Sequence, residues 1–266
     1  LGYYVSASAT NAPGTLNVNH FTARTTEWSG PAPAPEPEPE PEQPVEPGVL
    51  VDDAFDRSGE GFGSAGEGLS WSQWGSKATL STADGSGRMA WTGGGAAASS
   101  RLFGVEALDS DVRTKVRFAD APNGGGGYFS VQSRRSGNEF YAATLRARTG
   151  GTAELSLTRS AGGKEEVLTS VPLADLSVAR DQELNVRLET VTAPEGAGTV
   201  LRAKVWATGS EEPKEWQVQV EDSTASLQRA GVFELGYYVS ASATNAPGTL
   251  NVNHFTARTV ESPAAG

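Results

Sequence analysis

The chain has 266 residues, no cysteine, two histidines and a formal net charge of −11 at pH 7. Without cysteine it can form no disulfide and no thiolate site, and two histidines are too few for a histidine-rich metal centre. The acidic balance excludes a typical nucleic-acid binder, because there is no basic excess to neutralise phosphates.

The chain opens with a segment that recurs near its other end. Leu1–Thr25 is identical, letter for letter, to Leu235–Thr259, so His20 and His254 are one position of a repeat. Such identity is typical of a tandem array, with an engineered duplication as the alternative. Because an isolated hairpin is marginal in water, we expect 1–25 to be the closing strands of a preceding identical repeat, or a strand-exchange segment. The strand-exchange interpretation involves Tyr3, Tyr4, Val5, Leu16, Val18 and Phe21.

A proline- and glutamate-rich segment follows at 26–48. Eight of the 15 prolines lie within Pro31–Pro47, and no Lys or Arg occurs between Thr25 and Gly48. Proline excludes helix and central strand, and the alternation favours polyproline II stiffened by repulsion between glutamates. We therefore expect a linker that holds folded units apart, with a tether of no required length as the alternative.

The remaining residues, 49–259, are predicted to be all-β, with 260–266 as a tail or the start of another linker. Short alternating runs indicate strands near Val51, Trp71, Leu80, Met89 and Leu102. Further strands are predicted at 112–118, 128–133, 140–147, 153–158, 165–169, 183–189, 199–206, 216–221, 232–241 and 249–257, and a short helical piece at 224–228. Because alternation buries one face of each strand, we expect a two-sheet antiparallel jelly-roll sandwich.

Several short motifs of this region carry a family resemblance by their order and spacing. They are Asp53-Ala-Phe-Asp-Arg57, the Trp71 strand, Leu201-Arg-Ala-Lys-Val-Trp206 and the closing Val252-Asn-His-Phe255. Together they resemble the concanavalin-like, laminin-G-like jelly-roll repeats of actinobacterial, Gram-positive cell-surface adhesin-type proteins. The resemblance implies an extracellular sandwich domain used in tandem or beside other surface modules. We expect a cell-surface location, with anchoring to the cell wall through a region not present in this sequence. The resemblance does not by itself imply a ligand.

Two binding sites are candidates. For sugar, aromatic rings and arginines lie on strands that can share one face, with core aromatics and solvated arginines as the alternative; the residues are Tyr128, Arg134, Tyr141, Arg146 and Trp206. For calcium, which the laminin-G-like resemblance implies for many members, Asp52, Asp53 and Asp56 cluster near the first strand. Solvated carboxylates at a turn are the alternative there. We expect no other cofactor.

Catalytic chemistry is not expected from this chain. A single strand histidine, His254, offers no nucleophile system, and the Glu-x-Asp-x-x-Glu arrangement of concanavalin-like glucanases is missing from the sequence. We therefore expect a structural tandem-repeat unit of an extracellular adhesin, stalk or filament whose partners are neighbouring identical repeats. The alternative is a lectin-like sandwich that binds surface glycans by avidity, and a more distant one is a module appended to a polysaccharide-degrading enzyme. Neither a membrane span nor a nucleic-acid partner is expected.

Overall fold

The computed structural model of the chain describes residues 48–260, except 120 and 195–197. The chain divides into two units, Leu1–Pro44 and Val45–Gly266, and all described residues belong to the second. The expected strand-exchange residues Tyr3, Tyr4, Val5, Leu16, Val18 and Phe21 lie outside the described residues, as does most of the predicted linker.

The described strands form two antiparallel sheets. Sheet A has the strand order β15-β14-β13-β8-β17-β6-β5-β2, and β1 pairs with the end of β17. Its strands are β1 (Val49–Asp53), β2 (Gly59–Glu60), β5 (Ala78–Ala83), β6 (Ser86–Trp91), β8 (Ser110–Phe118), β13 (Glu183–Thr192), β14 (Thr199–Ala207), β15 (Val218–Asp222) and β17 (Gly248–Thr259).

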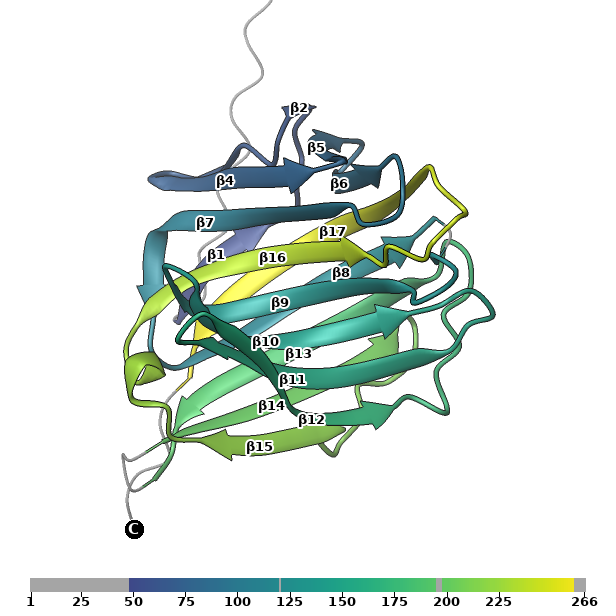
Figure 1. Cartoon of the computed structure of the whole chain (residues 1–266). Coiled ribbons are helices and arrows are strands. Elements are labelled where there is room, and N and C mark those ends of the chain that lie inside the picture. The colour runs from purple at the N-terminus through teal and green to yellow at the C-terminus, as the bar shows by residue number, and fades with distance from the viewer. Residues whose placement is uncertain (1–47, 120, 195–197, 261–266) are drawn as a thin grey trace, which may run out of the picture. The chain divides into compact units, whose positions relative to one another are not determined.

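Sheet B has the order β12-β11-β10-β9-β16-β7-β4-β3. Its strands are β3 (Ser64–Gly66), β4 (Leu69–Ser76), β7 (Ala97–Ala107), β9 (Gly127–Ser136), β10 (Glu139–Ala147), β11 (Ala153–Ala161), β12 (Lys164–Pro172) and β16 (Gly231–Val239). The two sheets stack face to face (Figure 1). The predicted jelly-roll sandwich is confirmed, and the helical piece expected at 224–228 is a single 3-10 turn, Ala225–Leu227.

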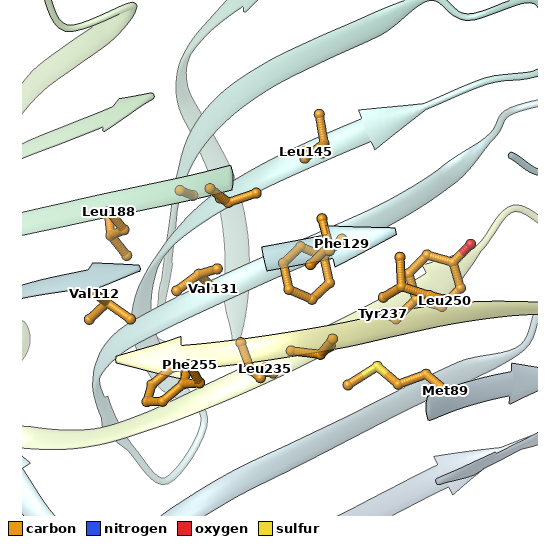
Figure 2. Packing of buried hydrophobic residues seen from close by; sticks show 14 of the residues in the cluster. Met89, Val112, Phe129, Val131, Leu145, Leu188, Leu235, Tyr237, Leu250 and Phe255 are labelled. Carbon is orange, nitrogen blue, oxygen red and sulfur yellow. The ribbon is translucent and has the colours of Figure 1, made fainter. Parts of the chain in front are cut away.

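The core lies between the sheets, where the inward side chains of both interdigitate (Figure 2). Phe129 and Leu145 from sheet B are fully buried, as are Met89, Leu188 and Leu250 from sheet A. Burying side chains of this size contributes about 1.5–3 kcal/mol each. The period-two pattern read from the sequence is thus the pattern that fills the space between the sheets.

The repeated segment occupies the centre of this fold. Leu235–Thr259 includes most of β16 and all of β17. In sheet B, β16 lies between β9 and β7, and in sheet A β17 lies between β8 and β6. One copy of the repeat therefore supplies a central strand to each sheet.

Candidate functional site

The outer face of sheet B, turned away from the core, carries a groove of about 920 Å³. It crosses β4, β7, β16, β9, β10 and β11, and the residues that line it come from successive cross-strand positions. Strand register arranges them in three rows that run across the strands.

The middle row is the floor and consists of small side chains beside one large ring. Gly236 lies opposite Ser99 on one side and Ser130 on the other. The row continues to Trp74 in one direction and to Thr144 and Ser156 in the other. Because neighbouring strands are about 4.8 Å apart, the row from β4 to β11 is about 24 Å long. Small residues at these positions are what makes the face hollow.

One wall of the groove is aromatic and cationic. Tyr238, Tyr128, Arg146 and Glu154 lie opposite one another in adjacent strands. The rings of Tyr128 and Tyr238 are 5.9 Å apart, and the Arg146 guanidinium lies 4.9 Å from the centre of the Tyr128 ring. Arg146 Nε also donates to the Gly125 carbonyl at 2.9 Å. These contacts hold the rings in place, and Tyr238 remains 42% exposed.

The other wall is built around a buried carboxylate. Arg101 Nε donates to Glu234 Oε2 at 2.8 Å, and Arg135 Nε lies 3.3 Å from the same oxygen. The Arg135 guanidinium stacks on the Phe140 ring at 4.5 Å. Burial lowers the pKa of Arg135, the nearby charge of Arg101 lowers it further, and Glu234 opposes both. Arginine stays protonated under such shifts, so this corner of the groove holds two cations around one anion.

Two uncharged polar atoms on this wall have no hydrogen-bond partner among the described residues. Within the part of the chain that the structure describes, Gln132 Oε1 and Thr158 Oγ1 are buried without a hydrogen-bond partner. Both residues line the groove. Since buried polar atoms in proteins are almost always satisfied, unpartnered ones beside a groove are places where water or a ligand completes the bonding.

At the far end of the floor, Trp74 is 61% exposed. An indole this open offers a flat apolar surface. The groove thus offers exposed aromatic faces together with hydroxyl and amide groups that have bonding capacity to spare.

Two of the five residues predicted for sugar binding lie in this groove, namely Tyr128 and Arg146. The expectation that all five share one face is wrong for the others. Tyr141 and Arg146 are five residues apart in one strand, so they face opposite sides. Tyr141 is fully buried in the core and its hydroxyl donates to Asp222 Oδ1 at 2.7 Å. Trp206 belongs to β14 of the other sheet.

Arg134 is turned inward by a β-bulge. Its φ is 49°, and the pairing register of β9 with β16 shifts between Val232 and Glu234. The extra residue reverses the alternation, so that Arg135 takes the outward position. Arg134 is 1% exposed and donates to the carbonyls of Leu108 at 2.7 Å and Leu227 at 3.0 Å. The side chain thus connects the segments at Leu108 and Leu227 to the core.

The predicted calcium ligands are not brought together. Asp52 and Asp53 are adjacent in β1, and their side chains bond to different partners. Asp52 Oδ1 is 2.6 Å from His254 Nε2, whereas the buried Asp53 is bound by Arg57 and by Trp71 Nε1 at 2.7 Å. Among the described residues, no group of three or more His, Asp or Glu side chains is placed to hold a metal ion.

The outer face of sheet A is also charged, but its groups are engaged with one another. Arg187 Nε donates to Asp111 Oδ1 at 2.9 Å and its Nη1 to Glu212 Oε1 at 2.5 Å. The Trp216 ring lies under the cations of Arg187, Arg202 and Lys204 at 4.7, 5.1 and 4.6 Å. These side chains form a closed network.

Several solved structures are similar to this fold. A β-glucanase of Bacillus licheniformis matches with a TM-score of 0.54 at 12% identity, covering 82% of this chain and all of that one. The GH16 protein of the Bacteroides ovatus mixed linkage glucan PUL, in complex with its G4G4G3G product, gives 0.53 at 6% identity, covering 79% and 100%. The CBM2 module of the evolved Dit of Lactobacillus casei BL23 phage J-1 gives 0.50 at 10% identity, covering 80% and 97%.

At these identities the likeness shows the fold alone: a concanavalin-like jelly roll of the kind found in lectins, carbohydrate-binding modules and glycoside hydrolases. Both enzymes and a binding module have this fold, so the fold alone does not determine whether a protein is catalytic.

No protein-family model and no curated protein matches the chain. Among the described residues, no helix is long and apolar enough to cross a membrane.

Proposed function

We propose that this chain is a glycan-binding, lectin-like sandwich of an extracellular protein and that sugar binds along the groove of sheet B. The observation that carries this proposal is the pairing of open aromatic faces with unpartnered polar atoms in one groove. Sugar rings present flat C–H faces that stack on aromatic side chains, and hydroxyls that need donors and acceptors. Trp74 and Tyr238 offer the first, and Gln132 and Thr158 offer the second.

The charge of the groove favours a neutral glycan. Its lining, within the described part of the chain, includes three arginines (Arg101, Arg135 and Arg146) and three glutamates (Glu154, Glu165 and Glu234). The opposite charges balance, and Glu234 is ion-paired with two of the arginines. A floor about 24 Å long suits several sugar units of one chain rather than a single terminal residue.

We infer binding without hydrolysis. A glycosidase needs one carboxyl group that gives a proton and a second that attacks or activates water. The buried carboxylate of this groove, Glu234, is held by two guanidinium groups, which position it as an ion-pair partner rather than as a proton donor. Incubation with oligosaccharides that bind should therefore release no reducing ends, and their release would contradict this inference.

A second, structural role is favoured by the sequence repeat. The identical segments Leu1–Thr25 and Leu235–Thr259 and the Pro/Glu stretch between Pro31 and Pro47 support a tandem array of sandwiches separated by linkers. In this proposal the array belongs to a cell-surface adhesin or stalk anchored to the cell wall, and weak sites in successive repeats gain avidity. Neighbouring repeats and surface glycans are the proposed partners.

The binding proposal is tested by screening the chain against an array of neutral oligosaccharides and titrating the strongest binder by calorimetry. Trp74→Ala and Tyr238→Ala should each weaken binding about tenfold with little change in melting temperature. The matched control is Phe103→Ala, because Phe103 is 44% exposed on the same sheet but does not line the groove. Equal affinity in all four proteins would contradict the groove as the site.

A further inference from the structure

We propose that sheet A carries a second glycan site, which binds a short oligosaccharide whose sugar units bear a carboxylate or a sulfate. The site is a hollow of about 460 Å³ on the outer face of this sheet, on the opposite side of the sandwich from the groove of sheet B. The proposal does not depend on glycan binding in that groove, because it rests on other residues and on the opposite choice of ligand charge.

The sheet A hollow follows one cross-strand row through four adjacent strands. His254 on β17 lies opposite Lys115 on β8. Asn185 on β13 comes next, and Trp206 on β14 ends the row. All four residues line the hollow. Since neighbouring strands are about 4.8 Å apart, the row is about 14 Å long. One short oligosaccharide can therefore reach both the ammonium group within the row and the indole at its end.

Two cations of the hollow are only loosely paired. The Lys115 side chain is 41% exposed, and its ion pair with a glutamate on β13 is 4.0 Å long. The Arg113 side chain is 43% exposed and lies 3.2 Å from Asp111 Oδ2 and 3.2 Å from Glu212 Oε2. Arg187 binds these two carboxylates more closely, at 2.9 and 2.5 Å. Long contacts between exposed charges stabilise little, so Lys115 and Arg113 have capacity to bind a further anion.

The charge of the hollow is opposite to that of the chain. Within the part of the chain that the structure describes, its lining has three basic side chains against two acidic ones, namely Arg113, Lys115, Arg258, Asp52 and Asp111. The whole chain has a formal net charge of −11. Asp52 Oδ1 is 2.6 Å from His254 Nε2, and Asp111 accepts from Arg187, so both carboxylates are already engaged. A positive hollow on an acidic protein favours an anionic ligand.

The remaining lining residues favour a sugar as the carrier of that anion. Trp206 is half-buried and lines the hollow, and an indole there can stack on the C–H face of a sugar ring. Asn185 Nδ2 donates to Thr208 Oγ1 at 3.1 Å, which orients the amide and leaves its Oδ1 to accept from a sugar hydroxyl. A carboxylate or sulfate has several oxygens, so it can bond to Lys115 and Arg113 together.

The first test titrates the chain by calorimetry with trigalacturonate, with its neutral methyl ester and with a sulfated trisaccharide. We expect at least one of the two charged ligands to bind and the ester to bind at least tenfold more weakly than trigalacturonate if the carboxylate is the ligand. Lys115→Gln and Trp206→Ala should each weaken binding of the charged ligand about tenfold, as expected for the loss of one charge-assisted hydrogen bond or one stacking surface.

The matched control is Arg88→Gln, which also removes one cation from sheet A. Its side chain is 39% exposed and does not line the hollow, so affinity should not change. Equal losses in Arg88→Gln and Lys115→Gln would overturn the proposal, because they would indicate a general effect of charge. Binding of neither charged ligand would overturn it as well, as would equal affinity for trigalacturonate and its ester without binding of the sulfated ligand.

The second test separates the two glycan sites. Trp74→Ala should leave the affinity for the charged ligand unchanged, and Trp206→Ala should leave that for a neutral glycan unchanged. Raising the ionic strength from about 0.1 M to about 1 M shortens the Debye length from about 10 Å to about 3 Å, so it should weaken binding of the charged ligand only. Competition between the neutral and the charged ligand would overturn a separate site. Binding of the charged ligand alone would contradict the groove of sheet B as a site and leave this proposal supported.

Discussion

The outer faces of the two sheets have similar charged and aromatic residues but use them differently. On sheet A, Asp111 and Glu212 are bound by Arg187, and the Trp216 ring is covered by cations. On sheet B, the Trp74 ring is 61% exposed and Thr158 Oγ1 has no partner within the described part of the chain. Groups that satisfy one another stabilise the fold, whereas groups left open are available to a ligand.

The largest expected effect on stability comes from breaking the ion-pair network on the outer face of sheet A. Asp111→Ala removes two charged hydrogen bonds from Arg187, whose side chain is 16% exposed and keeps Glu212 as a partner. We expect a loss of about 2–3 kcal/mol in the free energy of unfolding, because hydrogen bonds between charged groups are lost in a mostly buried place, with no change in the affinity for a neutral glycan. Urea denaturation measures it. Asp84→Ala breaks an exposed ion pair with Arg88 and should change stability by less than about 1 kcal/mol. Equal effects of the two substitutions would contradict the comparison.

The second prediction concerns how the stability contributed by Asp222 depends on pH. Burial alone would raise the pKa of Asp222, but hydrogen bonds from Tyr141 and Thr224 and the charge of Arg159 outweigh it, so its pKa lies below the usual value. The stability that Asp222 contributes is therefore full above the unfolded pKa of about 4 and lost as the pH falls through the lower native pKa. Asp222→Asn should be less stable by about 1–2 kcal/mol at pH 7.

Thermal melts of this variant and the natural protein across pH should show a constant gap from pH 6 to pH 8 and a narrowing gap below about pH 4. A gap that widened toward acid would contradict the assigned direction of the pKa shift.

A large side chain in the groove of sheet B should weaken glycan binding. A Cβ at Gly236 would lie 2.6 Å from Ser130 Oγ and 3.2 Å from Gln132 Nε2, so a larger side chain must rise into the groove. We expect Gly236→Leu to weaken glycan binding at least tenfold, which corresponds to about 1.4 kcal/mol. Titration calorimetry measures it, and Gly93→Leu, where a side chain meets open space, is the control. Unchanged affinity in Gly236→Leu would place the site elsewhere.

The smallest expected effect on glycan affinity comes from removing the hydroxyl of Thr158. Thr158→Val replaces a buried, unpartnered hydroxyl with a methyl group of similar shape, so stability should stay the same or rise slightly while glycan affinity falls by a few-fold. The matched control is Thr114→Val on sheet A, whose hydroxyl donates to the His254 carbonyl at 2.7 Å. It should lose about 1 kcal/mol of stability and no affinity. The reverse pattern would contradict the roles given to the two hydroxyls.

The sequence predicted the strands well, because alternation is a local property. The runs 140–147 and 199–206 correspond to β10 and β14 almost residue for residue. The two-sheet architecture followed from the same pattern. The order of strands within each sheet did not, because the pairing of β16 with β9 and β7 joins residues far apart in the chain.

The site was only partly predictable. Tyr128 and Arg146 were found because polar and aromatic residues alternate with buried ones, but the bulge at Arg134 reversed that alternation without a local signal. Trp74 and Tyr238 were missed because their strands join the groove only through long-range pairing. A usable signal was present in the floor: Ser130, Thr144 and Ser156 are small residues at outward positions of three strands, where larger polar side chains are more usual.

The pairing of β1 with β17 also determines how the sandwich responds to tension. Val49 lies opposite Arg258, and Thr259 is bonded to Gly48, so the chain reaches the sandwich and leaves it at neighbouring points. A pull on the flanking segments then loads the β1–β17 ladder one hydrogen bond at a time, as in opening a zip, instead of shearing all bonds together. The five residues of β1 would peel away first, and the rest of the core would stay closed. In an array, each repeat would thus extend a short way at low force before its core came under load.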